Sequence, residues 1–397
     1  MFDTKQNLIK KCYQKSIELL IANSNQYGIK ACADSKRAID KRYDYIFGRD
    51  ACICSLGMIA SRNKKLLRIA KDSLETLGTH QTSKGQIPFS TQPAIGKNIF
   101  WYLGSIDSTL WWLIALDFYN KYSLDSTLYE KYEIKIKKAL RWLSFQDQND
   151  CGMLEQGEAS GWADNMPDNG RVLYTNVLWS MVLSLYGYSR KRELVLDGLN
   201  NLFLPHTADL NRSKYILREI HRLKELRIIQ EQTENMPYYL HYVGHKYAGS
   251  HCDVYGNLLA ILFGVANQAR SQAIIRYMRN NGVNKKFPVQ VLFPPIKEKD
   301  EEWQDYMEEE NKPWHYHNGG IWPYVGAFWV MALAKAGKKD LAQEEFVNLA
   351  KVNKVNDWGF NEWFHGKSGK PMGMDKQSWN AGTFLLAYHY LKGEVDI

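Results

Sequence analysis

The feature that most constrains this chain is the spacing of its apolar residues, which recur every three or four positions along most of the sequence. Such spacing predicts amphipathic or buried helices, whereas the strand-like alternation of apolar and polar residues is scarce. The fold class is therefore expected to be all-α. The predicted helices cover roughly residues 5–23, 50–61, 64–79, 106–122, 127–146, 172–188, 190–202, 253–266, 268–280, 320–337, 340–353 and 377–392.

These helices are of two kinds. The helices that are apolar on nearly all sides, as buried helices are, include residues 108–118, 172–186, 254–265 and 321–333. The helices that carry many Lys and Glu on one face, as outer helices do, include residues 64–79, 127–141, 190–198 and 340–351. The two kinds alternate along the chain.

Twelve helices that alternate between inner and outer predict an (α/α)6 toroid, in which six helical hairpins close into a ring. Such a ring holds nearly 400 residues in a single domain, here residues 1–397. A helical-repeat solenoid is the alternative, but the chain shows no fixed repeat of about 34 or 40 residues. The toroid is the favoured fold.

Two segments depart from the helical pattern. Residues 204–250 are less regular and contain a basic, helix-like piece at 212–227, which indicates an inserted arm. This arm is expected either to close over a pocket or to contact a neighbouring subunit of a homo-oligomer. Residues 294–313 are acidic and flanked by prolines, so they are expected to form a solvated loop or a lid.

Composition excludes several classes of partner. The 51 Lys and Arg against 43 Asp and Glu are scattered, whereas a nucleic-acid site needs them on one face. No apolar run approaches the ~18 residues that span a membrane. The N-terminus lacks the apolar stretch of a signal peptide, so a cytoplasmic location is expected. Six cysteines without a CxxC pair indicate buried thiols rather than disulfides or a zinc site.

Aromatic and polar residues gather in short clusters before the predicted inner helices, at residues 47–50, 104–108, 161–167, 314–323 and 360–363. Inner helices of a toroid begin at one face, so these clusters are expected to line one central funnel. Trp and Tyr faces beside Asp, Asn, Arg and His suit a sugar, whose C–H faces pack on rings while its hydroxyls form hydrogen bonds. Helix capping is the alternative for single members such as Asp50 and Asp107.

Hydrolysis of a glycosidic bond needs one protonated and one ionised carboxyl group, and the sequence offers Asp164 and Glu362. Asp164 follows Trp162 in a Gly-rich loop, where an indole and partial burial would raise its pKa. The neighbouring carboxyl groups that compete for this role are Glu155, Glu158 and Asp168.

Glu362 lies among Phe360, Trp363 and Phe364, an apolar setting that is costly for a carboxylate without a task or a partner. The alternative is an ordinary ion pair, with the candidate cations Arg49, Arg171 and Lys376.

Cofactor chemistry is not expected. His315 and His317 are two residues apart and lack the HExxH context, so no metal site is predicted. The chain has neither a GxGxxG motif nor a P-loop, which argues against a nucleotide cofactor. Prenyl transfer would need an Asp-rich motif, and epimerisation would need paired histidines, for which His315 and His317 are weak candidates.

The C-terminal clusters resemble a known family. Residues 314–323, the apolar helix that follows, and then Glu362, Gln377 and Trp379 resemble the C-terminal half of the neutral/alkaline invertases, glycoside hydrolase family 100. Residues 107–112 and 253–262 are similar to further segments of these invertases. Together with the two stretches that follow, the resemblance covers roughly residues 43–392.

Two N-terminal stretches extend the resemblance to other glycosidases. Phe47-Gly48-Arg49-Asp50 resembles the Phe-Gly-Arg-Asp of amylo-α-1,6-glucosidase proteins, and residues 158–166 resemble the loop that carries the general acid in family 63 α-glucosidases and mannosylglycerate hydrolases. The invertases have Ile-Asp-Arg-Arg where this chain has Ala163-Asp164-Asn165-Met166. Because this loop touches the sugar, a short α-glucoside is as consistent with the sequence as sucrose.

The resemblance implies an (α/α)6 glycosidase that inverts the anomeric carbon, with Asp164 as general acid and Glu362 as general base. The two carboxyl groups would then lie ~6.5–9.5 Å apart, leaving room for a water molecule. The alternative is a degenerate member that binds carbohydrate without catalysis. The residues implied to hold the sugar are Arg49, Asp50, Asp107, Trp162, Trp314, His317, Asn318, Trp322, Gln377 and Trp379.

Overall fold

The computed structural model describes residues 2–397, with side chains from residue 5 onward. The twelve predicted helices all form, and short helices accompany them. The twelve are α1 (Phe2–Ala22), α3 (Gly48–Ala60), α4 (Lys64–Thr79), α5 (Asp107–Tyr122), α6 (Thr127–Ser144), α7 (Leu173–Leu185), α8 (Ser189–Leu202), α11 (Val254–Leu262), α12 (Gln268–Asn280), α14 (Pro323–Lys335), α15 (Lys339–Trp358) and α16 (Ser378–Leu391).

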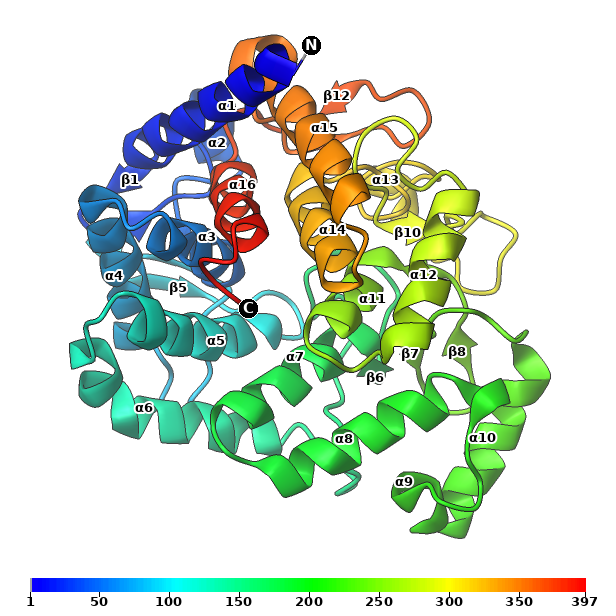
Figure 1. Cartoon of the computed structure of the whole chain (residues 1–397). Helices are drawn as coiled ribbons and strands as arrows, with labels where there is room; N and C mark the ends of the chain where they lie inside the picture. The colour runs from blue at the N-terminus through cyan, green and yellow to red at the C-terminus, as the bar shows by residue number, and fades with distance from the viewer. Residues whose placement is uncertain (1) are drawn as a thin grey trace.

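Six of these helices form a closed inner ring. In chain order α3, α5, α7, α11, α14 and α16 each contact the next, and α16 contacts α3. Figure 1 shows these six around the centre, with α1, α4, α6, α8, α12 and α15 outside them. The predicted (α/α)6 toroid is therefore confirmed.

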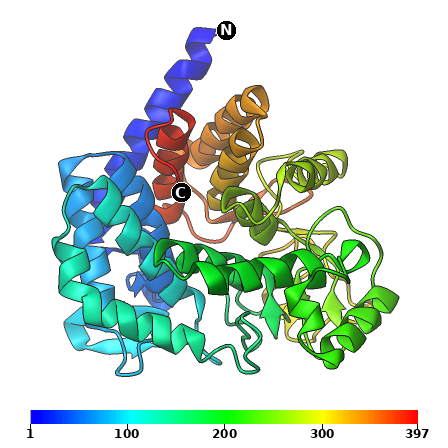
Figure 2. The same ribbon diagram turned by 60° about the horizontal axis from the view of Figure 1, so that its bottom comes forward.

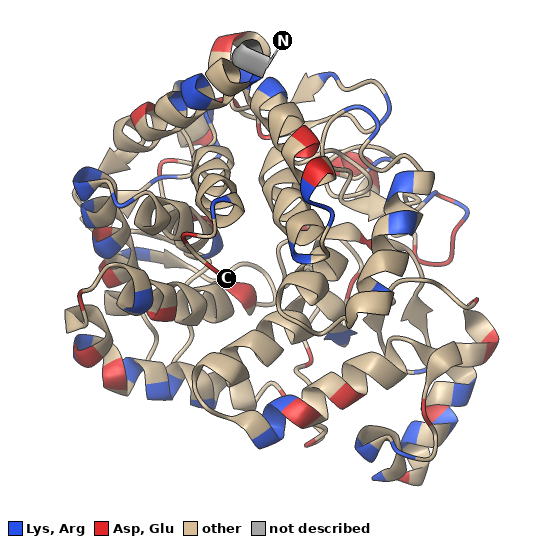
Figure 3. Cartoon of the chain, in the orientation of Figure 1, with Lys and Arg blue, Asp and Glu red and all other residues tan. Residues whose placement is uncertain are grey.

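The two kinds of helix differ because they bury different fractions of their surface. On α4 the buried residues recur every three or four positions, including Leu66, Ile69, Leu74 and Leu77, so one face packs inward. On α5 nearly every residue from Asp107 to Tyr119 is buried. Charged side chains accordingly lie mainly on the outer helices and connecting loops (Figure 3). Each large apolar side chain that is fully buried contributes about 1.5–3 kcal/mol.

The first and last inner helices approach each other most closely. A Cβ atom on Gly57 of α3 would lie 1.7 Å from the carbonyl oxygen of Gly382 on α16, and a Cβ on Gly382 would lie 2.7 Å from Cα of Cys54. Only glycine permits two backbones at this distance. The ring is therefore closed by a glycine-to-glycine contact.

Short antiparallel strands connect the helices. The strands β3 (Ile46–Phe47), β6 (Arg171–Val172) and β9 (Cys252–Asp253) each lead directly into an inner helix. They pair with β4 (Ser90–Gln92), β7 (Tyr242–Val243) and β10 (Leu292–Phe293), and β5 (Lys97–Ile99) and β8 (Ala248–Gly249) extend two of these sheets. The remaining pairs are β1 (Ser24–Asn25) with β2 (Gly28–Ile29) and β11 (Trp363–Phe364) with β12 (Pro371–Met372).

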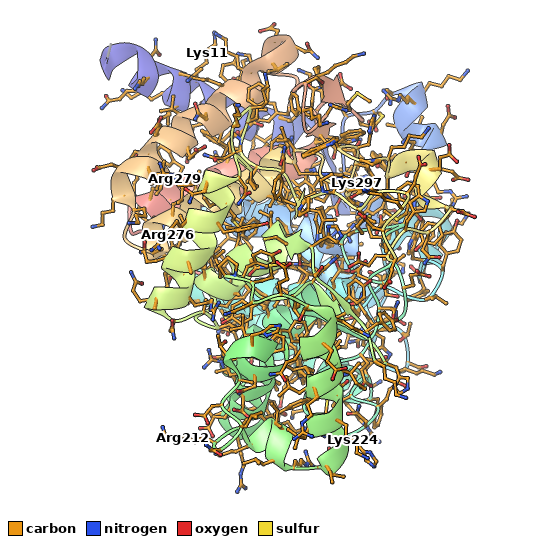
Figure 4. All side chains as sticks on the ribbon, turned by 90° about the vertical axis from the view of Figure 1, so that its right-hand side faces the viewer. Lys11, Arg212, Lys224, Arg276, Arg279 and Lys297 are labelled. Carbon is orange, nitrogen blue, oxygen red and sulfur yellow. The ribbon has the colours of Figure 1, made fainter. Side chains whose placement is uncertain are left out.

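The predicted arm contains η2 (Pro205–Thr207), α9 (Lys214–Leu217) and α10 (Ile220–Gln232). It packs against α8 at the outer edge of the ring (Figures 1 and 2). In Figure 4 the labelled Arg212 and Lys224 lie at its far end, away from the barrel. Arg171 links the arm to the barrel, because its guanidinium donates to Glu225 of α10 and to the hydroxyl of Tyr215.

The acidic segment 294–313, which includes α13 (Met307–Glu310), is more firmly anchored than a solvated loop would be. The amide of Ile296 donates to Oδ1 of Asn318 at 2.7 Å, and Nδ2 of Asn318 donates to the carbonyl oxygens of Ile296 and Asn311 at 2.8 and 2.9 Å. Nδ2 of Asn311 donates in turn to the carbonyl oxygen of Asn165 at 3.0 Å. The segment is thus attached to the loop that carries Asp164.

Within residues 2–397 no helix has the length and apolar character needed to cross a membrane. The six cysteines are buried and unpaired, as the prediction of buried thiols requires.

Candidate active site

A cavity of about 300 Å³ opens where the loops before the inner helices meet. Both candidate carboxyl groups, Asp164 and Glu362, line it. The predicted binding residues that also line it are Arg49, Asp50, Trp162, His317, Trp322, Gln377 and Trp379. Four of the five predicted clusters, at 47–50, 161–167, 314–323 and 360–363, therefore meet in one place, whereas no residue of the cluster at 104–108 lines the cavity.

Asp164 is a buried carboxyl group on the loop of residues 157–167, named here the Asp164 loop. Burial raises its pKa to about 7. The guanidinium of Arg49, whose Nη1 lies 4.0 Å from Oδ1 of Asp164, lowers this pKa. The negative charges of nearby carboxylates raise it further, namely those of Asp107, Asp50 and Glu310. Much of the Asp164 population is therefore protonated at neutral pH.

His317 helps to fix the backbone at Asp164. Its Nδ1 lies 2.9 Å from the carbonyl oxygen of Asp164, and because that partner only accepts, Nδ1 carries the proton. Burial lowers the pKa of His317 to about 3, so the ring is neutral. It stacks at 5.0 Å on the indole of Trp322, which lines the same cavity.

Glu362 is held through both carboxylate oxygens. The hydroxyl of Tyr43 donates to Oε1 at 2.8 Å, and the amide of Met374 donates to Oε2 at 2.8 Å. Burial raises the pKa of Glu362, and these two hydrogen bonds lower it. The two neutral donors thus orient the carboxylate and offset part of the cost of burying its charge.

The cations proposed as ion-pair partners of Glu362 bind elsewhere. Arg49 pairs with Asp107 at 3.1 Å, Arg171 with Glu225, and Nζ of Lys376 donates to the carbonyl oxygen of Trp358. Within the part of the chain that the structure describes, Glu362 forms no salt bridge.

The competing carboxyl groups lie outside the cavity. Glu158 accepts a hydrogen bond from the hydroxyl of Tyr306, and Glu155 accepts from the amide of Gln148. Asp168 is buried, with His241 3.9 Å away. Asp164 is therefore the member of this group that faces the cavity.

Three of the predicted binding residues do not line the cavity. Asp107 is fully buried and accepts hydrogen bonds from Arg49, Ser105 and Tyr174, so it holds Arg49 in place. Asn318 uses its amide to anchor the acidic segment, as described above. Trp314 packs on Phe293 with Lys367 over its ring. The sequence placed these side chains in the right loops but did not show which way they point.

The cavity also contains residues that the sequence did not single out, among them Tyr43, Phe89, Trp101, Glu310 and Tyr316. Burial raises the pKa of Tyr316, and the nearby charges of Glu362 and Asp164 raise it further. The aromatic run that contains Trp101 was a signal available in the sequence. Tyr43 carried none, because its importance arises only from its contact with Glu362, 319 positions away.

Several buried polar atoms of the cavity-lining residues have no hydrogen-bond partner within the described structure. The donors are Nε1 of Trp101, Nε2 of Gln377 and Nε1 of Trp379, and the acceptor is Oδ1 of Asp164. Each unsatisfied buried group costs about 1–3 kcal/mol. Donors and acceptors mixed around one cavity match a ligand with many hydroxyl groups, which both donate and accept.

Some residues that line the cavity also have a strained backbone. Four of the lining residues have a positive φ although they are not glycine: Arg42 (60°), Trp101 (51°), Asn165 (62°) and Tyr316 (38°). Such conformations cost about 1–3 kcal/mol each and cluster at functional sites. These four strained positions form part of the cavity wall.

The chain is similar to known glycoside hydrolases in both sequence and fold. A family model described as alkaline and neutral invertase matches residues 234–393. Alkaline/neutral invertase C, mitochondrial, of Arabidopsis thaliana is 26% identical over 336 residues, which are 74% of this chain and 49% of that protein. Cytosolic invertase 1 of Oryza sativa subsp. japonica is 30% identical over 139 residues, 33% of this chain and 24% of that protein. The chain spans about half the length of the first curated relatives.

Among solved structures, the family 63 mannosylglycerate hydrolase from Thermus thermophilus superposes with a TM-score of 0.61 at 15% identity, covering 94% of this chain and 99% of that one. This likeness establishes the shared fold. The chain is therefore an (α/α)6 barrel that resembles the neutral and alkaline invertases in sequence and the family 63 glycoside hydrolases in structure, and glycosidase is the enzyme class of these relatives.

Proposed function

We propose that this protein is an inverting glycosidase that cleaves a small α-linked glucoside or a sucrose-like saccharide. The observation that carries the proposal is the pair of buried carboxyl groups in one cavity, Asp164 and Glu362, held in different ways. The first has a pKa of about 7 and an oxygen without a partner, and the second accepts two hydrogen bonds. An inverting mechanism needs this division between acid and base.

In the proposed reaction Asp164 donates its proton to the glycosidic oxygen while the bond from that oxygen to the anomeric carbon breaks. Glu362 takes a proton from a water molecule, whose oxygen attacks the anomeric carbon from the opposite face. Asp164 ends ionised and Glu362 ends protonated, and exchange of one proton with solvent restores both. Their carboxyl groups are expected to stand ~6.5–9.5 Å apart for this water to fit.

The surrounding residues have separate proposed tasks. Tyr43 and the amide of Met374 aim the Glu362 carboxylate, and Arg49 limits the rise in the pKa of Asp164. Trp379 and Gln377 offer unpartnered donors to the sugar hydroxyls. The cavity volume of about 300 Å³ lies at the lower end of the ~300–1,000 Å³ typical of small-molecule sites, which supports a small saccharide.

The assignment of acid and base is tested by removing one titratable group at a time. Asp164→Asn and Glu362→Gln should each lower kcat at least ~100-fold, because general acid or base catalysis contributes about 10²–10⁴-fold. Helical circular dichroism should be unchanged. Glu158→Gln is the matched control, since Glu158 lies in the same loop but outside the cavity. Near-normal turnover in either cavity variant would reject the assignment.

The substrate is tested by a screen of sucrose, trehalose, maltose, isomaltose and glucosylglycerate for released monosaccharide. The first sugar that forms from an α-glucoside should be the β-anomer when followed by NMR. An α-anomer would overturn inversion while leaving glycoside hydrolysis intact. Saccharide binding without any hydrolysis would favour the degenerate, carbohydrate-binding alternative.

For the rest of the chain we propose one glycosidase domain, with the anchored segment 294–313 as a wall of the cavity and the arm 204–250 as a contact for a second copy. No residue of the arm lines the cavity, and Leu217 and Ile220 on it are exposed. Sedimentation of the intact protein tests this contact. The buried, unpaired cysteines and the cytosolic rice relative support a cytoplasmic location, although other relatives are named mitochondrial.

A further inference from the structure

We infer that residues 101–103 form an outer sugar-binding platform, which takes the next ring of an oligosaccharide beyond the one that leaves. The inference rests on the proposed glycosidase function and adds the substrate class: a neutral saccharide extended on the leaving-group side. The platform consists of Trp101, Tyr102 and Leu103, between the β4–β5 hairpin and α5.

A continuous row of aromatic rings leads from the cavity to this platform. Phe47 and Phe89 pack edge to face at 5.3 Å, Phe89 stacks on Trp101 at 5.0 Å with the planes 24° apart, and Trp101 contacts Tyr102 at 4.7 Å. The first three of these residues line the cavity. The platform is thus an extension of the cavity wall.

The outer end of the row is exposed to an unusual degree. Tyr102 is 81% exposed and Leu103 is 67% exposed, side by side in the chain. Adjacent exposed apolar side chains mark binding surfaces more often than scattered ones do. Trp101 adds two signs of a ligand: its Nε1 donor is buried without a partner, and its φ of 51° is strained.

The platform lies on the side of the general acid. The amide of Ile106 donates to the carbonyl oxygen of Ser160 at 3.1 Å, so the segment after the platform runs along the Asp164 loop. Leu103 packs so closely against Gly157 that a Cβ on this glycine would lie 3.0 Å from it. Because Asp164 protonates the leaving oxygen, the leaving part of the substrate must extend towards this loop.

The chemistry of the platform selects a neutral ring. No charged residue occurs between Lys97 and Asp107, so the platform segment itself offers an ionic group no partner. Exposed aromatic faces suit the C–H face of a pyranose, and the indole N–H suits a sugar hydroxyl. A further sugar of the same saccharide meets both conditions.

The test compares each disaccharide with its trisaccharide extended on the leaving side: maltose with maltotriose, and sucrose with 1-kestose. In the unchanged protein kcat/KM should be about 3- to 10-fold higher for the trisaccharide of the accepted pair, the gain expected of one aromatic stack. Tyr102→Ala should bring this ratio close to one and should affect the trisaccharide far more than the disaccharide. Tyr188→Ala, which removes an exposed tyrosine between α7 and α8, should keep the ratio.

Equal kcat/KM for the two lengths in the unchanged protein, or an unchanged ratio in Tyr102→Ala, would overturn the platform while leaving the glycosidase proposal intact. Absence of all hydrolysis would instead refute the proposed function. In that case calorimetric titration with maltose and maltotriose decides about the platform. Tighter binding of maltotriose that Tyr102→Ala abolishes would sustain it, and equal affinities would reject it.

Discussion

At the scale of single residues, the proposed mechanism requires the two carboxyl groups of the cavity to be in different protonation states. Burial raises the pKa of both, but Arg49 limits the rise at Asp164 and two neutral donors limit it at Glu362. The proposed mechanism therefore predicts a bell-shaped pH profile. Its alkaline limb should reflect Asp164 losing its proton near pH 7, and its acidic limb should reflect Glu362 gaining one.

Tyr43→Phe should move the acidic limb alone. The Tyr43 hydroxyl stabilises the ionised form of Glu362, so its removal raises the pKa of Glu362 and shifts this limb to higher pH. We also expect kcat to fall about tenfold. The measurement is kcat/KM against pH, with Tyr186→Phe, which removes a buried hydrogen bond to Leu113 far from the cavity, as control. A shift of the alkaline limb instead would place Tyr43 at the acid.

Asp164→Asn should stabilise the fold increasingly as pH rises. The carboxyl has a pKa of about 7 in the folded chain and about 3.8 when unfolded, so the folded state binds the proton more tightly. Its contribution to the free energy of unfolding therefore falls between pH 4 and 7, and the full cost of a few kcal/mol is present above pH 7. Urea unfolding at pH 5 and pH 8 measures this. An equal effect of the substitution at both pH values would contradict it.

At the scale of elements, a buried ion pair attaches the arm to the barrel. Arg171 precedes α7 and follows the Asp164 loop, and its guanidinium is almost fully buried against Glu225 of α10. A buried ion pair is weak evidence of net stabilisation, but loss of one partner leaves the other charge uncompensated. Loss of either partner of this ion pair should therefore lower the free energy of unfolding substantially.

Glu225→Ala should lower the free energy of unfolding by about 2 kcal/mol or more, because Arg171 then keeps only Tyr215 as a side-chain partner. KM should change little, since no residue of the arm lines the cavity. Thermal unfolding and saccharide kinetics measure the two effects. Glu231→Ala, an exposed position on the same helix, is the control. A raised KM with normal stability would mean that the arm acts on the substrate.

The elements also show how far sequence alone leads. The bounds of α4 and α6 follow from apolar residues that recur on one helix face. The location of the cavity follows from the aromatic and polar clusters that precede the inner helices. The orientation of a single side chain within a cluster does not follow, because it depends on distant partners. Asp107 turns to Arg49 and Tyr174, and Asn318 turns to Ile296, and neither partnership leaves a local pattern.

At the scale of the whole molecule, closure of the ring depends on the contact between α3 and α16. Gly57→Ala should lower the free energy of unfolding by about 2 kcal/mol or more, because its methyl group meets the backbone of Gly382, which cannot move aside without shifting a helix. Chemical denaturation measures the loss. Ser55→Ala on the same helix removes one hydroxyl and should cost less than half as much. Equal losses would show that the helices adjust freely.

The same glycine contact constrains how the protein can be made. A nascent chain leaves the ribosome from its N-terminus at about 5–20 residues per second, so helix α3 emerges roughly 15–70 s before its partner α16. During that interval α3 lacks its native partner, so the ring cannot close. The last helix to be synthesised, α16, is therefore the one that packs on α1 and α3 and closes the ring, so folding of this barrel must finish after translation has reached α16.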